Sequence, residues 1–119
     1  MKTILLADDN TTTRSALALL LSTRFEFEQV FTAVDWDGLL STAQRQRPEL
    51  ILLDWELPGC TPTQGHEALR AILPDVRLIV LSARPEHRQA ALAIGIQTFV
   101  SKLDAPDRLL AIIQAMQSP

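Results

Sequence analysis

The sequence predicts an α/β fold in which a parallel five-stranded sheet is covered by helices on both faces. Short apolar runs recur along the chain, and each is followed by a segment whose apolar residues have helical spacing. The run Leu50–Leu53 is apolar without a break, which is typical of a central strand buried on both sides. Alternating strands and helices form parallel sheets, and right-handed connections place the carboxyl ends of all strands at one edge.

Composition limits the classes to which the protein can belong. The chain has 119 residues, so we expect residues 1–119 to form a single domain, with the last few residues where a linker would begin. The formal net charge is −3, which argues against direct nucleic-acid binding by this domain. No apolar run approaches the roughly 20 residues of a membrane span, and the single cysteine, Cys60, fits a reducing compartment. We therefore expect a cytoplasmic protein without a membrane segment.

The first strand and helix follow from residues 3–24. Thr3–Ala7 is a short apolar strand candidate. Asn10–Thr13 supplies N-cap side chains for a helix that extends to about Arg24. The expected apolar face of this helix consists of Ala16, Leu17, Leu19, Leu20 and Leu21.

The next elements lead to a carboxylate at a strand end. Phe25–Phe31 alternates apolar and polar residues, which predicts a half-exposed edge strand. Asp35 and Asp37 open a second helix, which ends before Pro48. The uninterrupted strand then delivers Asp54 at or just past its carboxyl end, where ligands bind in open α/β sheets. On this stretch alone, Asp54 is more simply a turn-capping residue.

The second half of the chain continues the alternation. Gly59–Gly65 has the composition of a loop. Gly95 is suited to end the fourth helix, and Pro106 to begin the fifth. In chain order, we expect a helix at 66–73, a strand at 77–82, a helix from Pro85 or Glu86 to Ile94, a strand at 97–101 and a final helix.

Polar side chains stand where four of the five strands end. Asp8 and Asp9 follow the first strand, and Asp54, Ser82 and Lys102 stand at the ends of the third, fourth and fifth. Three crowded carboxylates repel one another, and a divalent cation such as Mg²⁺, which prefers oxygen ligands, would relieve that repulsion. A hydroxyl and an ammonium group are donors suited to phosphate oxygens. The set indicates phosphoryl transfer onto an aspartate.

The same residues carry a family resemblance. The segments Leu6–Asn10, Leu52–Asp54 with Leu57–Gly59, Leu81–Ala83 and Val100–Lys102 resemble the signature of two-component response regulator receiver domains. They occur in order, at the expected spacing, and cover essentially the whole chain. The resemblance implies a flavodoxin-like (βα)5 fold with strand order 2-1-3-4-5.

The resemblance also implies roles for the strand-end residues. Asp54 would be the phosphoacceptor, supplied by a sensor histidine kinase or a phosphotransfer protein. Asp8, Asp9 and Asp54 would hold Mg²⁺, completed by a main-chain carbonyl near Trp55 or Glu56, which we assign to Glu56.

The remaining family positions concern the bound phosphoryl group and the conformational switch. Ser82 would donate a hydrogen bond to the phosphoryl group, and Lys102 would pair with another of its oxygens. Phe99 matches the aromatic residue that turns inward when the hydroxyl moves, so Ser82 and Phe99 would form the switch.

Several positions depart from the family pattern. Leu103 follows Lys102 where the family has proline, and since a cis bond before a non-proline residue costs about 2.5–4 kcal/mol, we expect a trans bond there. The segment 58–65 is longer than usual and borders the site. Glu56 and Arg84 either pair across the acceptor or both point into solvent.

Residues outside the signature are interpreted more simply. We expect Trp36 and Trp55 to be packing residues. We expect His66 and His87 to be surface side chains on helices, neither placed to relay phosphate. Cys60 and His66 make a poor metal pair, because two ligands are too few.

Four functions remain open on the sequence alone. The first is a phosphoacceptor switch, which catalyses only its own phosphorylation and dephosphorylation and controls an output domain outside this chain, with or without a phosphorylation-dependent homodimer. The second is a degenerate receiver that acts only through protein contacts. A haloacid-dehalogenase-type hydrolase would carry its nucleophile after the first strand in an Asp-x-Asp arrangement, but this chain has Asp8-Asp9. A flavin-binding flavodoxin would need a phosphate loop that the first strand lacks.

Overall fold

The structure is a computed structural model that describes residues 2–117. Ser118 and Pro119, on which the expected linker falls, lie outside the described residues. Strands and helices alternate from one end to the other: β1 (Thr3–Ala7), α1 (Thr11–Arg24), β2 (Gln29–Ala33), α2 (Trp36–Gln46), β3 (Leu50–Asp54), α3 (Pro62–Ile72), β4 (Arg77–Ser82), α4 (His87–Ala93), β5 (Phe99–Ser101) and α5 (Pro106–Gln117).

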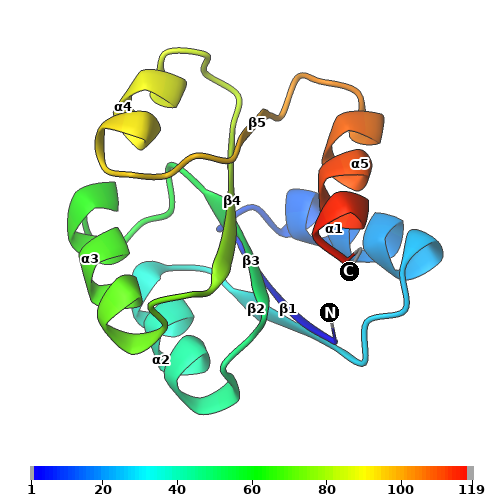
Figure 1. Cartoon of the computed structure of the whole chain (residues 1–119), viewed down its shortest axis with the longest axis horizontal. Coiled ribbons are helices and arrows are strands. Elements are labelled where there is room, and N and C mark those ends of the chain that lie inside the picture. The colour runs from blue at the N-terminus through cyan, green and yellow to red at the C-terminus, as the bar shows by residue number, and fades with distance from the viewer. Residues whose placement is uncertain (1, 118–119) are drawn as a thin grey trace.

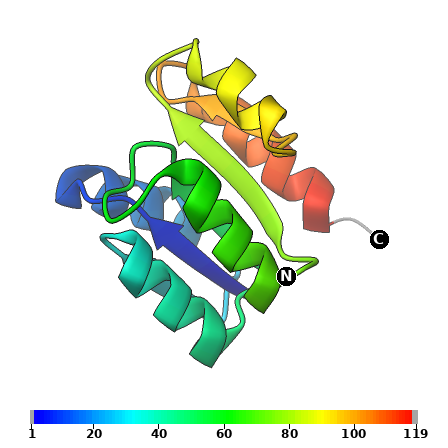
Figure 2. The same cartoon turned by 90° about the vertical axis from the view of Figure 1, so that its left-hand side faces the viewer.

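All five strands are parallel and lie in the order β2-β1-β3-β4-β5. Helices α1 and α5 cover one face of the sheet, and α2, α3 and α4 cover the other (Figures 1 and 2). This arrangement confirms the predicted flavodoxin-like (βα)5 fold. It places β1 and β3 side by side, so their carboxyl ends are neighbours.

The strands divide their side chains between two cores, since successive residues point to opposite faces. In β1, Leu5 and Ala7 pack with α2, α3 and α4, while Ile4 and Leu6 pack with α1 and α5. All five residues of β3 are buried. An apolar strand covered on both sides is what the uninterrupted run predicted.

Side-chain caps begin the first two helices. The Asn10 side chain accepts a hydrogen bond from the Thr13 N–H, and the Asp35 side chain accepts one from the Gly38 N–H. Each cap satisfies a backbone donor that the first helical turn leaves unpaired. The first cap lies directly after Asp8 and Asp9, so it also determines where the chain turns away from the carboxyl edge.

The predicted second strand, Phe25–Phe31, is wrong in its position. The strand spans Gln29–Ala33, and its pairing with β1 begins at Thr3 and Gln29. Phe25 and Phe27 instead pack together and against the core beneath α1. The alternation of apolar and polar residues is therefore explained by Phe25 and Phe27, whose rings pack on the core from the segment that connects α1 to β2. The strand does lie at an edge of the sheet, as expected.

The predicted loop at Gly59–Gly65 is also wrong in part. Helix α3 begins at Pro62, four residues before the predicted start. Thr61 and Gln64 form a capping box in which each side chain accepts a hydrogen bond from the other's backbone N–H. Proline is favoured at the first position of a helix, so Pro62 begins α3 rather than breaking it.

Smaller differences concern boundaries and one side chain. The fifth strand begins at Phe99 rather than residue 97, and α4 begins at His87 rather than at Pro85 or Glu86. Leu19, expected on the buried face of α1, is 67% exposed. Leucine has high helix propensity at exposed positions too, which is why spacing alone does not separate Leu19 from its buried neighbours.

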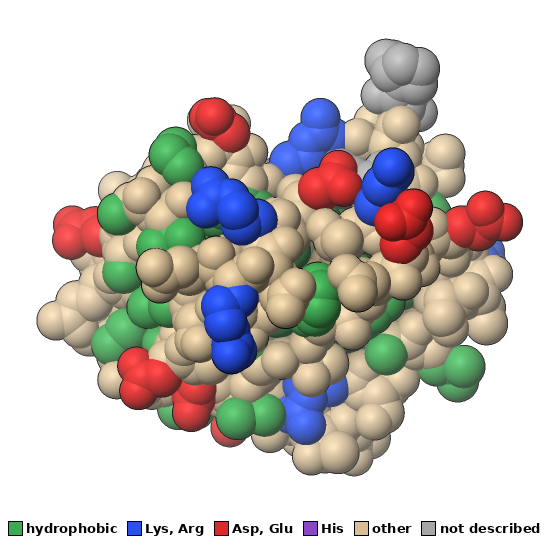
Figure 3. Space-filling view, turned by 90° about the horizontal axis from the view of Figure 1, so that it is seen from below, with side chains coloured by type: hydrophobic (Ala, Val, Ile, Leu, Met, Phe, Trp, Pro, Cys, Tyr) green, Lys and Arg blue, Asp and Glu red, His purple; other side chains and the backbone are tan. Residues whose placement is uncertain are grey.

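No helix within residues 2–117 is both long and apolar enough to cross a membrane. On the face shown in Figure 3, acidic and basic side chains lie interspersed, with hydrophobic side chains between them. That face therefore lacks a continuous positively charged patch of the kind that attracts nucleic acid.

Trp36 joins α2 to α3 and to the connection that leaves the carboxyl edge. Its side chain is fully buried, and its backbone N–H donates to the Pro58 carbonyl at 2.9 Å. Gly65 lies so close to the ring that an added Cβ would come within 2.4 Å of ring carbons. Trp36 is thus the packing residue the sequence predicted, and it needs a glycine opposite.

We expect Gly65→Ala to lower the free energy of unfolding by about 1–3 kcal/mol, because the methyl group would overpack against Trp36. Helix propensity alone would give the opposite sign, a gain of about 1 kcal/mol. Urea unfolding followed by circular dichroism measures the change. Thr63→Ala, an exposed substitution in the same helical turn, is the control and should stay within about 0.5 kcal/mol. A Gly65→Ala protein as stable as this control would show that α3 does not pack on Trp36 as described.

Candidate functional site

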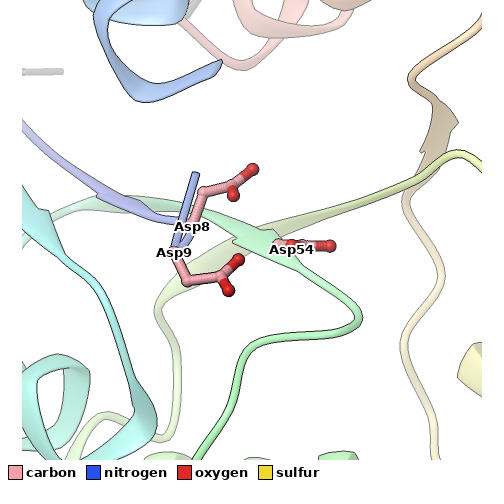
Figure 4. A group of neighbouring side chains, drawn as sticks. All are labelled: Asp8, Asp9 and Asp54. Carbon is pink, nitrogen blue, oxygen red and sulfur yellow. The ribbon is translucent and has the colours of Figure 1, made fainter. Parts of the chain in front are cut away.

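Three carboxylates meet at the carboxyl edge of the sheet. Asp54 is the last residue of β3, and Asp8 and Asp9 directly follow β1 (Figure 4). One oxygen from each carboxylate can be chosen so that all three lie within 4.8 Å of one another. Asp8 and Asp54 are 3% and 7% exposed, whereas Asp9 is open to solvent. The structure therefore brings together the acidic residues that the sequence placed at neighbouring strand ends.

Lys102 reaches this cluster from the other side of the sheet edge. Its Nζ lies 2.9 Å from Asp8 Oδ2 and 3.4 Å from Asp54 Oδ1. Its backbone N–H donates to the Ser82 carbonyl at 2.8 Å. One residue after β5 thus connects the ends of β1, β3 and β4.

Backbone donors orient the buried carboxylates. Asp8 Oδ1 accepts the Asn10 N–H at 2.9 Å, and Asp54 Oδ1 accepts the Glu56 N–H at 3.1 Å. In each case the donor lies two residues further on, as in an Asx turn. Asp54 therefore does form the turn that the simpler interpretation proposed. Asp54 Oδ2 has no hydrogen bond to any residue within 2–117.

Burial and charge shift the titration of two of these groups. Burial raises the pKa of Asp54, and the Asp8 charge adds to the rise, while the Glu56 N–H and Lys102 oppose it. Burial alone would lower the pKa of Lys102, but its hydrogen bond to Asp8 and the charges of Asp54 and Asp8 outweigh burial and raise it. Lys102 is therefore a firmly held ammonium ion, and Asp54 is a carboxylate whose charge is incompletely compensated.

The charge of the cluster fits a divalent cation. Three carboxylates and one ammonium leave two negative charges, and the donors are all oxygen, as Mg²⁺ prefers. The raised pKa of Asp54 also points to a missing positive charge, because a cation beside the carboxylate would lower that pKa toward its ordinary value. Asp8, Asp9 and Asp54 are thus chemically suited to hold Mg²⁺.

Ser82 lies at the same edge, and it has a partner that sequence reasoning missed. Ser82 is 2% exposed as a residue; its Oγ accepts the Arg84 N–H at 3.1 Å and lies 2.7 Å from His87 Nδ1. The His87 ring also lies 5.9 Å from the ring of Trp55. His87 is therefore half-buried in contact with the site, and the surface position expected for it holds only in part. The available signal was its place in the first turn of the helix that follows Ser82.

The other aromatic and histidine positions fit their expected environments in part. Phe99 is a buried core residue, 3% exposed, and the Arg88 guanidinium lies 4.8 Å from its ring centroid. Trp55 packs partly buried against the same core. His66 is half-buried in α3 and accepts a hydrogen bond from Arg70 Nε, so it lies away from the carboxylate cluster.

Two departures from the family pattern have structural outcomes. Glu56 and Arg84 pair at 3.4 Å, although both side chains are more than half exposed, so the pair contributes little to stability. The bond between Lys102 and Leu103 is trans, as expected, because there is no cis peptide bond in the described part of the chain. The Leu103 side chain is exposed, and its N–H donates to Ser101 Oγ.

Comparison with known proteins identifies one family over nearly the whole chain. The family model "Response regulator receiver domain" matches residues 4–114. The phosphate regulon transcriptional regulatory protein PhoB of Klebsiella pneumoniae is 32% identical over 117 residues, covering 95% of this chain and 50% of the relative. The probable transcriptional regulatory protein TcrX of Mycobacterium tuberculosis is 28% identical, covering 96% of this chain and 49% of the relative. The chain spans about half the length of the curated relatives it matches.

Solved structures agree with the fold. The chemotaxis response regulator CheY4 of Vibrio cholerae superposes with a TM-score of 0.83 at 26% identity, covering 97% of this chain and 98% of that one. A DNA-binding response regulator of the LuxR family from Staphylococcus aureus gives a TM-score of 0.85 at 19% identity, covering 99% and 100%. The second likeness concerns the fold alone.

We expect Asp54→Asn to stabilise the metal-free domain at neutral pH by about 0.5–2 kcal/mol, as removal of functional-site strain commonly does. Because the folded-state pKa of Asp54 is raised, the folded state holds its proton more tightly than the unfolded state. Wild-type stability therefore falls as pH rises above about 4, where an unfolded aspartate ionises. The advantage of the variant should disappear below that pH.

Thermal unfolding in the presence of a chelator, at several pH values, measures this difference. Asp104→Asn, which removes an exposed pair with Arg108, is the control and should lack the pH dependence. An Asp54→Asn protein that is less stable than wild type at neutral pH would contradict the assignment of Asp54 as a poorly compensated charge.

Proposed function

Because the chain belongs to the response regulator receiver family, we propose that it is a phosphoacceptor of a two-component system, which takes a phosphoryl group onto Asp54 and changes conformation in response. The observation that carries this proposal is the position of Asp54. Its carboxylate ends a buried strand, beside two further carboxylates and 3.4 Å from an ammonium group. That environment suits a nucleophile that must accept a highly charged group.

In the transfer, an Asp54 oxygen forms a bond to phosphorus while the bond from phosphorus to the donor nitrogen breaks. The electron pair of that bond remains on the donor imidazole of a histidine kinase or phosphotransfer protein. Oδ1 already accepts the Glu56 N–H and lies near Lys102. Oδ2 has no such partner within residues 2–117, and we assign it as the attacking oxygen.

The other rim residues bind the transferred group. We propose that Lys102 donates to one phosphoryl oxygen and the Ser82 hydroxyl to another, since charged and hydroxyl donors bind phosphate oxygens well. Mg²⁺, when bound by Asp8, Asp9, Asp54 and the Glu56 carbonyl, would neutralise charge on the phosphoryl oxygens. The buried position of Ser82 means that its hydroxyl must move or turn to reach the group, which with Phe99 would constitute the switch.

The alternative is a degenerate receiver that works through protein contacts alone. The presence of all three carboxylates, the hydroxyl and the ammonium at one edge favours the phosphoacceptor. Self-catalysed phosphorylation and dephosphorylation would be its only chemistry.

The length and names of the relatives suggest a wider context for this domain. Curated relatives of about twice this length are named transcriptional regulators. We propose that residues 1–119 act as one receiver domain in the cytoplasm and control an output domain outside this segment. A phosphorylation-dependent homodimer would be one way of doing so, with no nucleic acid bound by the receiver itself.

We expect the domain to gain the mass of one phosphoryl group when it is incubated with Mg²⁺ and a small phosphodonor such as acetyl phosphate. Intact-mass spectrometry measures the gain. Asp54→Asn should abolish it, because the amide is no nucleophile, and a chelator should suppress it. Asp104→Asn should leave it unchanged. A gain that persists in Asp54→Asn would place the acceptor elsewhere, and no gain in wild type would favour the degenerate receiver.

We expect Asp9→Asn to weaken Mg²⁺ binding roughly tenfold or more, because affinity depends on the number of charged ligands. Asp9 is exposed and makes no hydrogen bond among the described residues, so the substitution should leave the fold intact. The fluorescence of Trp55, beside Asp54, reports binding in a Mg²⁺ titration, and Trp55→Phe shows how much of the signal is its own. Asp75 is an exposed carboxylate outside the cluster, so Asp75→Asn should match wild type. Equal Mg²⁺ affinities for wild type, Asp9→Asn and Asp75→Asn would rule out the site.

A further inference from the structure

We propose that His87 is a positioning residue that holds the Ser82 hydroxyl in the unphosphorylated domain and competes with the phosphoryl group for it. The inference rests on the proposed function. Its basis is the 2.7 Å distance between Ser82 Oγ and His87 Nδ1. Ser82 is almost fully buried, so few other groups can reach its hydroxyl.

Hydrogen-bond counting assigns the direction of this bond. A serine hydroxyl has one proton to donate and can also accept. Ser82 Oγ already accepts the Arg84 N–H at 3.1 Å. If Ser82 donates to a neutral His87 Nδ1, every group is satisfied. If Nδ1 carried the proton instead, the Ser82 proton would have no acceptor within residues 2–117. The resting state is therefore Ser82 O–H donating to Nδ1, with the imidazole proton on Nε2.

His87 and the phosphoryl group compete because the Ser82 hydroxyl has only one proton to donate. A phosphoryl oxygen on Asp54 needs the Ser82 hydroxyl as a donor, and the hydroxyl cannot donate to Nδ1 at the same time. Phosphorylation must therefore break the bond to His87. His87 acts through Ser82 and touches no reacting atom itself.

Release of His87 would be transmitted to helix α4. His87 is the first residue of α4, and Glu86 before it makes no side-chain cap hydrogen bond. The next residue, Arg88, lies over the ring of Phe99. Two consecutive residues of one helical turn thus contact the hydroxyl and the aromatic ring of the switch, so a shift of one is communicated to the other.

His87→Phe tests the proposal, because it keeps an aromatic ring against Trp55 and removes Nδ1. With Mg²⁺ and acetyl phosphate, we expect the rate of phosphoryl gain to rise about fivefold, the factor that corresponds to one net hydrogen bond of about 1 kcal/mol. In a Ser82→Ala background the same substitution should change nothing, since the hydroxyl is absent. A role in packing alone would change the rate in both backgrounds. His66→Phe, a matched substitution in α3, should behave as wild type.

A second measurement requires no substitution. Imidazole ¹⁵N NMR of the wild-type domain should show His87 as the neutral Nε2–H tautomer with a hydrogen-bonded Nδ1. Addition of beryllium fluoride with Mg²⁺, as a phosphoryl mimic, should shift the Nδ1 resonance, and the shift should be absent in Asp54→Asn.

The outcomes separate the two proposals. Failure of wild type to gain a phosphoryl group overturns the proposed function. Normal gain in wild type, with His87→Phe equal to it or changed equally in the Ser82→Ala background, overturns the role of His87 alone. An Nδ1 resonance that the mimic does not shift does the same.

Discussion

The site depends on the charge imbalance among Asp8, Asp54 and Lys102. Two buried carboxylates are held against a single ammonium, with Nζ at 2.9 Å from one and 3.4 Å from the other. Burying unbalanced charge is costly, and the raised pKa of Asp54 records that cost. The fold maintains it because each carboxylate is fixed by a backbone N–H two residues away. The same negative imbalance makes this edge chemically suited to a divalent cation.

The imbalance is possible only because the sheet is sealed on both faces. Alternate residues of β1 and β3 enter two separate cores, one under α1 and α5 and the other under α2, α3 and α4. Asp54 stands where β3 ends, at the carboxyl edge, and is 7% exposed. Trp36 supports this edge from the side, since it holds the Pro58 carbonyl and packs against Gly65. Packing far from Asp54 thus determines how strongly its carboxylate is shielded from solvent and how firmly it is held.

Much of this could be predicted from residue patterns, for identifiable reasons. The strand at Leu50–Asp54 is apolar throughout, and parallel topology then brings Asp8, Asp54 and Lys102 to one edge whatever the details of the loops. Local chemistry was harder to predict. Pro62 and Gly65 resemble loop residues, yet a capping box begins the helix at Pro62, and Gly65 is required by a ring that is distant in sequence. Phe25 and Phe27 alternate with acidic residues as in a strand, but the pairing register of β1 decides where β2 begins.

His87 shows why side-chain partners are the least predictable part of the site. His66 also lies on a helix, and the sequence distinguishes His87 from it only by its place in the first turn after Ser82. What differs is the direction in which α4 leaves β4, which brings Nδ1 to the Ser82 hydroxyl. The same short connection carries Arg84, which pairs with Glu56 and donates its N–H to Ser82. The segment from Ser82 to Arg88 therefore contacts Glu56, two residues past Asp54, and the ring of Phe99. Under the proposed function, a change of charge at Asp54 would reach α4 through this segment by exchange of hydrogen bonds, and the packed sheet would not need to deform.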